Sequence, residues 1–65
     1  MYFTAHENSQ YRFQTSRLGD VIATRLIDGK EVYFQPGDAG STILDVLEEN
    51  PPEHALDIFI NDYFA

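Results

Sequence analysis

Residues 21–35 have the sequence VIATRLIDGKEVYFQ, in which two runs rich in β-branched and aromatic residues flank Asp28-Gly29. Asp-Gly favours a two-residue hairpin turn, because both central positions can adopt positive φ. We therefore expect strands on both sides, with Ile27 opposite Lys30 and Ala23 opposite Phe34. The face expected to point into the core holds Val21, Ala23, Ile27, Val32 and Phe34, and the other face holds Ile22, Thr24, Leu26, Glu31 and Tyr33.

Residues 11–16 alternate in the same way, with Tyr11, Phe13 and Thr15 on one side. The break at residues 18–20 can return this segment onto the hairpin, which gives a three-stranded antiparallel meander. Residues 2–4 are compatible with a further short strand, and residues 6–10 are expected to form a polar loop.

A helix over residues 18–27 is the alternative for this region, capped by Ser16 and ended by Gly29. Leu18, Val21, Ile22 and Leu26 fit its spacing. Gly19 would cost such a helix about 1 kcal/mol relative to Ala. The β-branched residues of the segment also favour a strand, so we prefer the strand.

Two helices are expected after the breaker segment 35–40, which includes Asp38 in a turn. The first covers about residues 42–49 and is capped by Ser41 or Thr42. Its apolar side consists of Ile43, Leu44, Val46 and Leu47, and its polar side of Asp45, Glu48 and Glu49.

The second helix has Asn50 as its cap, Pro51 at its first position and Glu53 placed to return a bond to the cap. It runs to about Phe64. Its buried stripe consists of Leu56, Phe59, Ile60 and Tyr63, and its exposed flank of Glu53, Asp57 and Asn61. The expected architecture is one α+β domain over residues 1–65, with two short amphipathic helices packed on one face of the meander.

The composition limits how this domain can be stabilised and where it can act. There is no cysteine, and aromatic residues make up 14% of the chain, so we expect an aromatic core without cross-links in a monomer or small homo-oligomer. No signal segment or membrane span is visible, which predicts a cytoplasmic protein, in the host cell if it is phage-encoded. The net charge of −7 argues against direct binding to nucleic acid or to anionic membranes.

The charge is unevenly distributed along the chain. No Lys or Arg follows Lys30, whereas that part carries eight carboxylates: Glu31, Asp38, Asp45, Glu48, Glu49, Glu53, Asp57 and Asp62. Uncompensated like charge opposes compaction, so this layout indicates a surface shaped for a positively charged partner. A solvated face that keeps a small protein soluble is the alternative explanation.

Interactions of the carboxylates with the helix dipoles account for only part of the excess negative charge after Lys30. Glu53 and, in part, Asp45 can complement the positive end of a helix dipole, but Glu48 and Glu49 come at the negative end. Glu53 and Asp57 form a like-charge i,i+4 pair, which should also be unfavourable. We therefore take Asp45, Glu48, Glu49, Glu53, Asp57 and Asp62 as candidate partner-binding residues, with Tyr33, Tyr63 or Phe64 as exposed apolar anchors.

Carboxylates at i and i+4 of a helix lie ~6 Å apart along its axis, which is comparable to the spacing of successive phosphates. Two such helices could imitate a short piece of duplex backbone and bind the basic groove of a DNA-binding protein. In its size, acidity, lack of cysteine and lack of a catalytic motif, the chain resembles the small phage-encoded anti-CRISPR proteins that act as DNA mimics. The resemblance implies a CRISPR effector complex as the partner, blocked where it recognises target DNA; mimics aimed at restriction enzymes or nucleoid proteins fit similarly.

Other functions have less support in the sequence. The serines and the two histidines, His6 and His54, lie in no recognisable catalytic context, so we expect no enzyme activity and no cofactor. His54 and Asp57 are too few to make a metal site. The rival hypotheses are a generic acidic interaction module, such as an antitoxin, an immunity protein or a small subunit, and a homodimer paired through Ile22, Leu26 and Tyr33.

Overall fold

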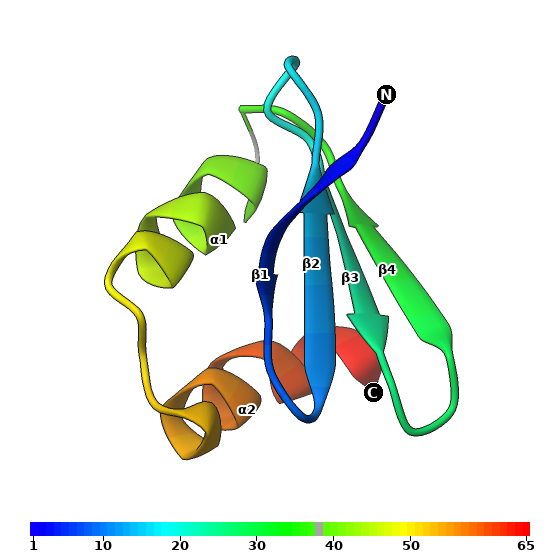
Figure 1. Cartoon of the computed structure of the whole chain (residues 1–65), viewed down its shortest axis with the longest axis vertical. Coiled ribbons are helices and arrows are strands. Elements are labelled where there is room, and N and C mark those ends of the chain that lie inside the picture. The colour runs from blue at the N-terminus through cyan, green and yellow to red at the C-terminus, as the bar shows by residue number, and fades with distance from the viewer. Residues whose placement is uncertain (38) are drawn as a thin grey trace.

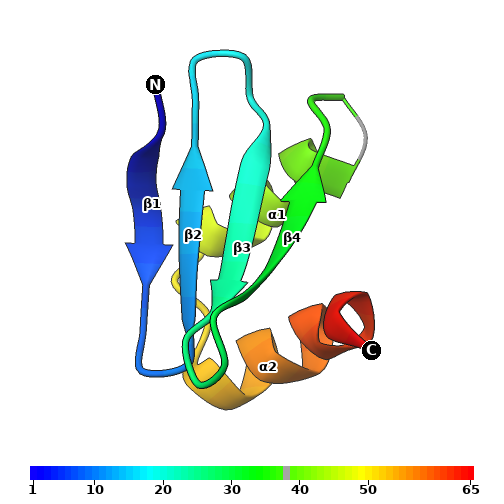
Figure 2. The ribbon, with the colours of Figure 1, turned by 90° about the vertical axis from the view of Figure 1, so that its right-hand side faces the viewer.

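The computed structural model describes residues 1–37 and 39–65, so the predicted turn at Asp38 lies outside the described residues. Four strands form one antiparallel sheet in the order β1-β2-β3-β4: β1 (Phe3–Glu7), β2 (Tyr11–Thr15), β3 (Val21–Arg25) and β4 (Lys30–Phe34). Helices α1 (Ala39–Glu48) and α2 (Glu53–Asn61) follow, and a short 3-10 helix, η1 (Asp62–Phe64), ends the chain. Both helices lie on the same side of the sheet (Figures 1 and 2). The α+β class is confirmed, and none of the described helices is long and apolar enough to cross a membrane.

The prediction of three strands was wrong, because β1 is a full member of the sheet. It extends through His6 and Glu7, which we expected in a polar loop, and pairs Glu7 with Arg12 of β2. The guanidinium of Arg12 lies 3.0 Å from the Glu7 carboxylate. β1 is an edge strand whose residues are exposed apart from the half-buried His6, so polar residues are compatible with it.

The hairpin of β3 and β4 is confirmed, and the helical alternative for residues 18–27 is wrong, but the register differs from the expected one. Arg25 pairs with Lys30 and Ala23 with Val32, which leaves residues 26–29 as a four-residue loop. Asp28 closes this loop by accepting hydrogen bonds from the Arg25 side chain and from the backbone N–H of Lys30, at 2.6 and 3.1 Å. Ile27, expected in the core, is consequently 91% exposed.

The helix boundaries also differ from the prediction. α1 begins at Ala39, so Ser41 and Thr42 lie inside it instead of capping it. Asn50 has a φ of 49° and donates its backbone N–H to the carbonyl of Leu47, so it ends α1 and does not cap α2. Pro52, in an extended conformation and without a side-chain bond, precedes α2.

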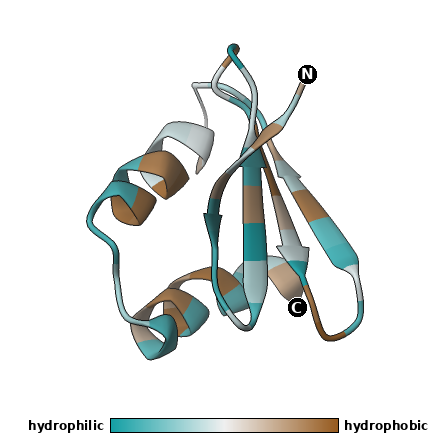
Figure 3. Cartoon of the chain, viewed as in Figure 1, coloured by the Kyte–Doolittle hydropathy of each residue, from teal (hydrophilic) through white to brown (hydrophobic). Residues whose placement is uncertain are grey.

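The core lies between the sheet and the helices, and Figure 3 shows hydrophobic residues on both helices and on the strands. Its buried residues are Tyr11, Phe13, Val21, Ala23, Phe34, Ile43, Leu47, Leu56, Ile60 and Phe64. Phe64 was expected as an exposed anchor but is only 3% exposed, because η1 folds its ring back against Tyr11, with 5.6 Å between ring centroids. Tyr63, which was predicted to belong to the buried stripe of the second helix, is exposed.

Gly40 determines how closely α1 approaches the loops at one end of the sheet. A Cβ atom at this position would lie 2.9 Å from the carbonyl oxygen of Gln35 and 3.1 Å from that of Gly19. Only glycine therefore allows the first turn of α1 to pack against these two backbone segments.

Candidate partner-binding surface

Three carboxylates lie on the solvent side of α1 and in the turn that follows it. Asp45, Glu48 and Glu49 are all exposed, and their i, i+3, i+4 spacing places them on one face, away from buried Ile43 and Leu47. None of the three carboxylates makes a hydrogen bond or an ion pair with any residue in the described part of the chain. We call these three residues the acidic face of α1.

The acids of α2 differ from those of α1, because they are bound to the sheet region. Glu53 accepts hydrogen bonds from the backbone N–H of Ser9, at 3.0 Å, and from its hydroxyl, at 2.7 Å. These bonds hold the pKa of Glu53 below its usual range. Glu53 thus joins the first turn of α2 to the β1–β2 loop and does not return a bond to Asn50.

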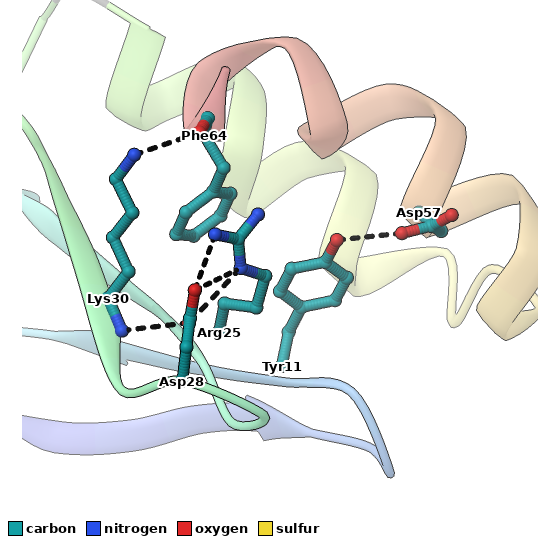
Figure 4. Close-up of polar contacts among 6 residues, drawn as sticks. All are labelled: Tyr11, Arg25, Asp28, Lys30, Asp57 and Phe64. Atoms are coloured by element: carbon teal, nitrogen blue, oxygen red, sulfur yellow. Dashed lines mark hydrogen bonds and ion pairs between the residues drawn. The ribbon is translucent and has the colours of Figure 1, made fainter.

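Asp57 is the second carboxylate that connects α2 to the sheet. Its Oδ1 accepts a hydrogen bond of 2.7 Å from the hydroxyl of Tyr11 (Figure 4). Burial, and then the bond to Asp57, raise the pKa of Tyr11 to about 12. The like-charge pair of Glu53 and Asp57 is therefore tolerated because each carboxylate has its own hydrogen-bond donor.

Asp62 is exposed in η1, which follows the last residue of α2, whereas Glu53 begins that helix. The structure thus brings Asp45, Glu48 and Glu49 together on α1 and in the turn that follows it. α2 begins four residues after Glu49, at Glu53. The structure does not gather all six candidate residues on one helix face.

Three of the four basic side chains have partners elsewhere in the molecule, and Arg17 forms no ion pair with any described residue. Arg12 pairs with Glu7, and Arg25 pairs with Asp28 and lies over the ring of Phe64, 5.1 Å from its centroid. The Lys30 ammonium donates a hydrogen bond of 2.9 Å to the backbone carbonyl of Phe64 (Figure 4). The acidic face of α1 is therefore not neutralised by any cation among the described residues.

Sequence reasoning missed the hydrogen-bonded cluster around Asp20. This carboxylate is 3% exposed and accepts hydrogen bonds from the hydroxyls of Tyr2, Ser16 and Tyr33, the last at 3.1 Å. The bonds from Ser16 and Tyr2 lower the pKa of Asp20, and the pKa of Tyr2 is raised to about 12 by its bond to Asp20. No local pattern connects these residues, since Tyr2 and Asp20 are 18 positions apart. Tyr33 keeps an exposed ring, but its hydroxyl belongs to this cluster.

No group of three or more metal-ligating side chains is present among residues 1–37 and 39–65. No protein-family model, curated protein or solved structure matches the chain.

Proposed function

We propose that this protein is a small acidic inhibitor that binds the basic groove of a nucleic-acid-handling protein in place of DNA. The acidic face of α1 is the proposed contact. The observation that carries the proposal is that the carboxylates of Asp45, Glu48 and Glu49 are exposed together without a partner among the described residues, whereas those of Glu53 and Asp57 have one.

The position of these carboxylates on the helix supports an external role. Glu48 and Glu49 are at the C-terminal end of α1, where a negative charge costs about 0.3–1 kcal/mol, and the last turn has no basic residue. A negative charge that destabilises its own helix is explained if it contributes to binding a partner.

The spacing and the net charge support a resemblance to nucleic acid. Asp45 and Glu49, at i and i+4, are ~6 Å apart along the helix axis, on the scale of neighbouring phosphates. The net charge of −7 would steer the protein toward a basic groove. In the anti-CRISPR form of the proposal, the groove is the one through which a CRISPR effector complex holds target DNA.

A generic acidic interaction module is the second candidate, and exposed apolar side chains favour it. Ile27 and Ile58 are 91% and 75% exposed, so they are accessible for apolar contacts with a protein partner. A module of this kind would bind a basic partner outside its nucleic-acid groove. A homodimer paired through the outer sheet face belongs to this second candidate, and light scattering would measure it.

Competition distinguishes the two candidates. Purified CRISPR effector complexes and nucleoid proteins, each bound to a fluorescent duplex, would be titrated with the wild-type protein while anisotropy is followed. The mimic should release the duplex, and its affinity should fall steeply with salt. A ternary complex with bound duplex would instead support the generic module.

A further inference from the structure

A cleft of about 510 Å³ opens between the β1–β2 loop, the β3–β4 loop and α2. It lies apart from the acidic face of α1, none of whose residues line it. Its walls differ in character: Asp57 and Asn61 provide a polar wall, and Leu26 and Ile27 provide an apolar one.

The polar wall offers acceptors that the fold does not use. Asp57 and Asn61 are one helical turn apart on α2, so their side chains are neighbours. Tyr11 holds Oδ1 of Asp57 in place. The other carboxylate oxygen and the Asn61 carboxamide receive no hydrogen bond from the described residues.

The apolar wall is held in position by the β3–β4 loop. Leu26 donates its backbone N–H to the carbonyl of Gln10 at 2.9 Å, and Gly29 donates to the carbonyl of Arg25 at 2.8 Å. The ion pair of Arg25 and Asp28 closes the loop. These bonds hold the loop in a conformation in which Ile27 is exposed to solvent.

The charges around the cleft favour a cation. Arg25 also lines it, but its guanidinium is paired with Asp28 at 2.6 Å and lies over the ring of Phe64. This ion pair leaves Asp57, with Glu53 one turn before it on α2, as uncompensated negative charge. This excess of negative charge would repel a free anion.

We propose that this cleft binds the side chain of an arginine or lysine that a partner protein presents. The aliphatic stem would lie on Leu26 and Ile27, and the charged head would donate to the free oxygen of Asp57 and to the carboxamide oxygen of Asn61. Long basic side chains combine an apolar stem with a charged tip, which matches the two walls. The inference does not depend on DNA mimicry, because it concerns a different surface.

The test is a titration of the folded protein with N-acetyl-arginine methylamide and its lysine counterpart, followed by amide NMR shifts. We expect saturable shifts at Ile27 and Asn61, and none with the uncharged norleucine analogue. Asp57→Asn retains an acceptor for Tyr11 but removes the charge, and it should weaken binding at least tenfold. Glu31→Gln removes the same charge from an exposed position on β4 outside the cleft and should leave the affinity unchanged.

Asn61→Leu, at an exposed position, provides a second variant and should also weaken binding. Shifts that stay linear with concentration, or equal shifts at Glu48 and Glu49, would show general ionic attraction and overturn the proposal. Unchanged affinity in both cleft variants would overturn it as well. None of these measurements involves a DNA-binding partner, so they remain informative if the mimicry proposal fails.

Discussion

The hydroxyl of Tyr11 donates a hydrogen bond of 2.7 Å to Oδ1 of Asp57, 46 residues further along the chain. Together with the bonds from Ser9 to Glu53, it fastens α2 to the sheet at two successive turns. These contacts divide the acidic residues into two groups. Glu53 and Asp57 of α2 each accept a bond that joins the helix to the sheet region, whereas the carboxylates of Asp45, Glu48 and Glu49 have no such bond with the described residues.

Tyr11→Phe should lower the free energy of unfolding by about 1 kcal/mol, because it removes one hydrogen bond without changing the packing of the ring. Urea denaturation measures the effect. Tyr63→Phe is the matched control, since its exposed hydroxyl makes no hydrogen bond with the described residues, and it should change stability by less than about 0.5 kcal/mol. Equal effects of the two substitutions would contradict the structural role of the Asp57 bond.

Acidification should destabilise the protein partly through Asp20. The folded state lowers the pKa of Asp20, so its stabilising contribution is complete above the unfolded value near 4 and is lost as pH falls through the folded value. The pKa of Asp28, which the bond from Arg25 lowers to about 2, acts in the same direction. Asp20→Asn should be less stable than wild type at pH 7 and should lose less stability between pH 5 and pH 2. Parallel pH profiles from thermal unfolding would exclude this role for Asp20.

Gly40→Ala should destabilise the protein by about 1–3 kcal/mol, although alanine is the better helix former. The added methyl group would meet the Gln35 carbonyl at 2.9 Å, and backbone cannot move away as a flexible side chain can. Chemical denaturation measures the change, and Thr42→Ala at an exposed position of the same helix serves as a comparison. A gain in stability for Gly40→Ala would show that α1 does not approach the loops this closely.

Glu48→Lys with Glu49→Lys should raise the free energy of unfolding by about 0.5–2 kcal/mol, because cations then occupy the negative end of the α1 dipole. The proposed function requires the same variant to lose partner binding. Denaturation at low and high salt would check the stability effect, which should shrink on screening. A destabilised double variant would mean that these glutamates have a structural role within the fold.

The sequence predicted those features that depend on local periodicity. Tyr11, Phe13 and Thr15 alternate with polar residues, and the structure buries all three. Contacts between distant segments were not predictable in the same way. Asp28-Gly29 fits a two-residue turn, yet the bond from Arg25 to Asp28 closes a four-residue loop and moves Ile27 out of the core.

Asn50 illustrates a different limit of sequence reasoning. Asparagine favours both a helix N-cap and the left-handed conformation that ends a helix, so its position between two helical segments supports either role. Ser9 and Tyr11, which donate hydrogen bonds to Glu53 and Asp57, lie 44 and 46 residues earlier in the sequence. The candidate site could therefore be narrowed to α1 only once the tertiary contacts were known.

Displacement of duplex DNA is the measurement that addresses the mimicry proposal itself. A basic effector complex bound to a fluorescent duplex would be titrated with wild-type protein and with a variant carrying Asp45→Lys, Glu48→Lys and Glu49→Lys. We expect wild type to release the duplex completely and the folded variant to release none. Simultaneous binding of duplex and protein, or equal displacement by the charge-reversed variant, would contradict the proposal.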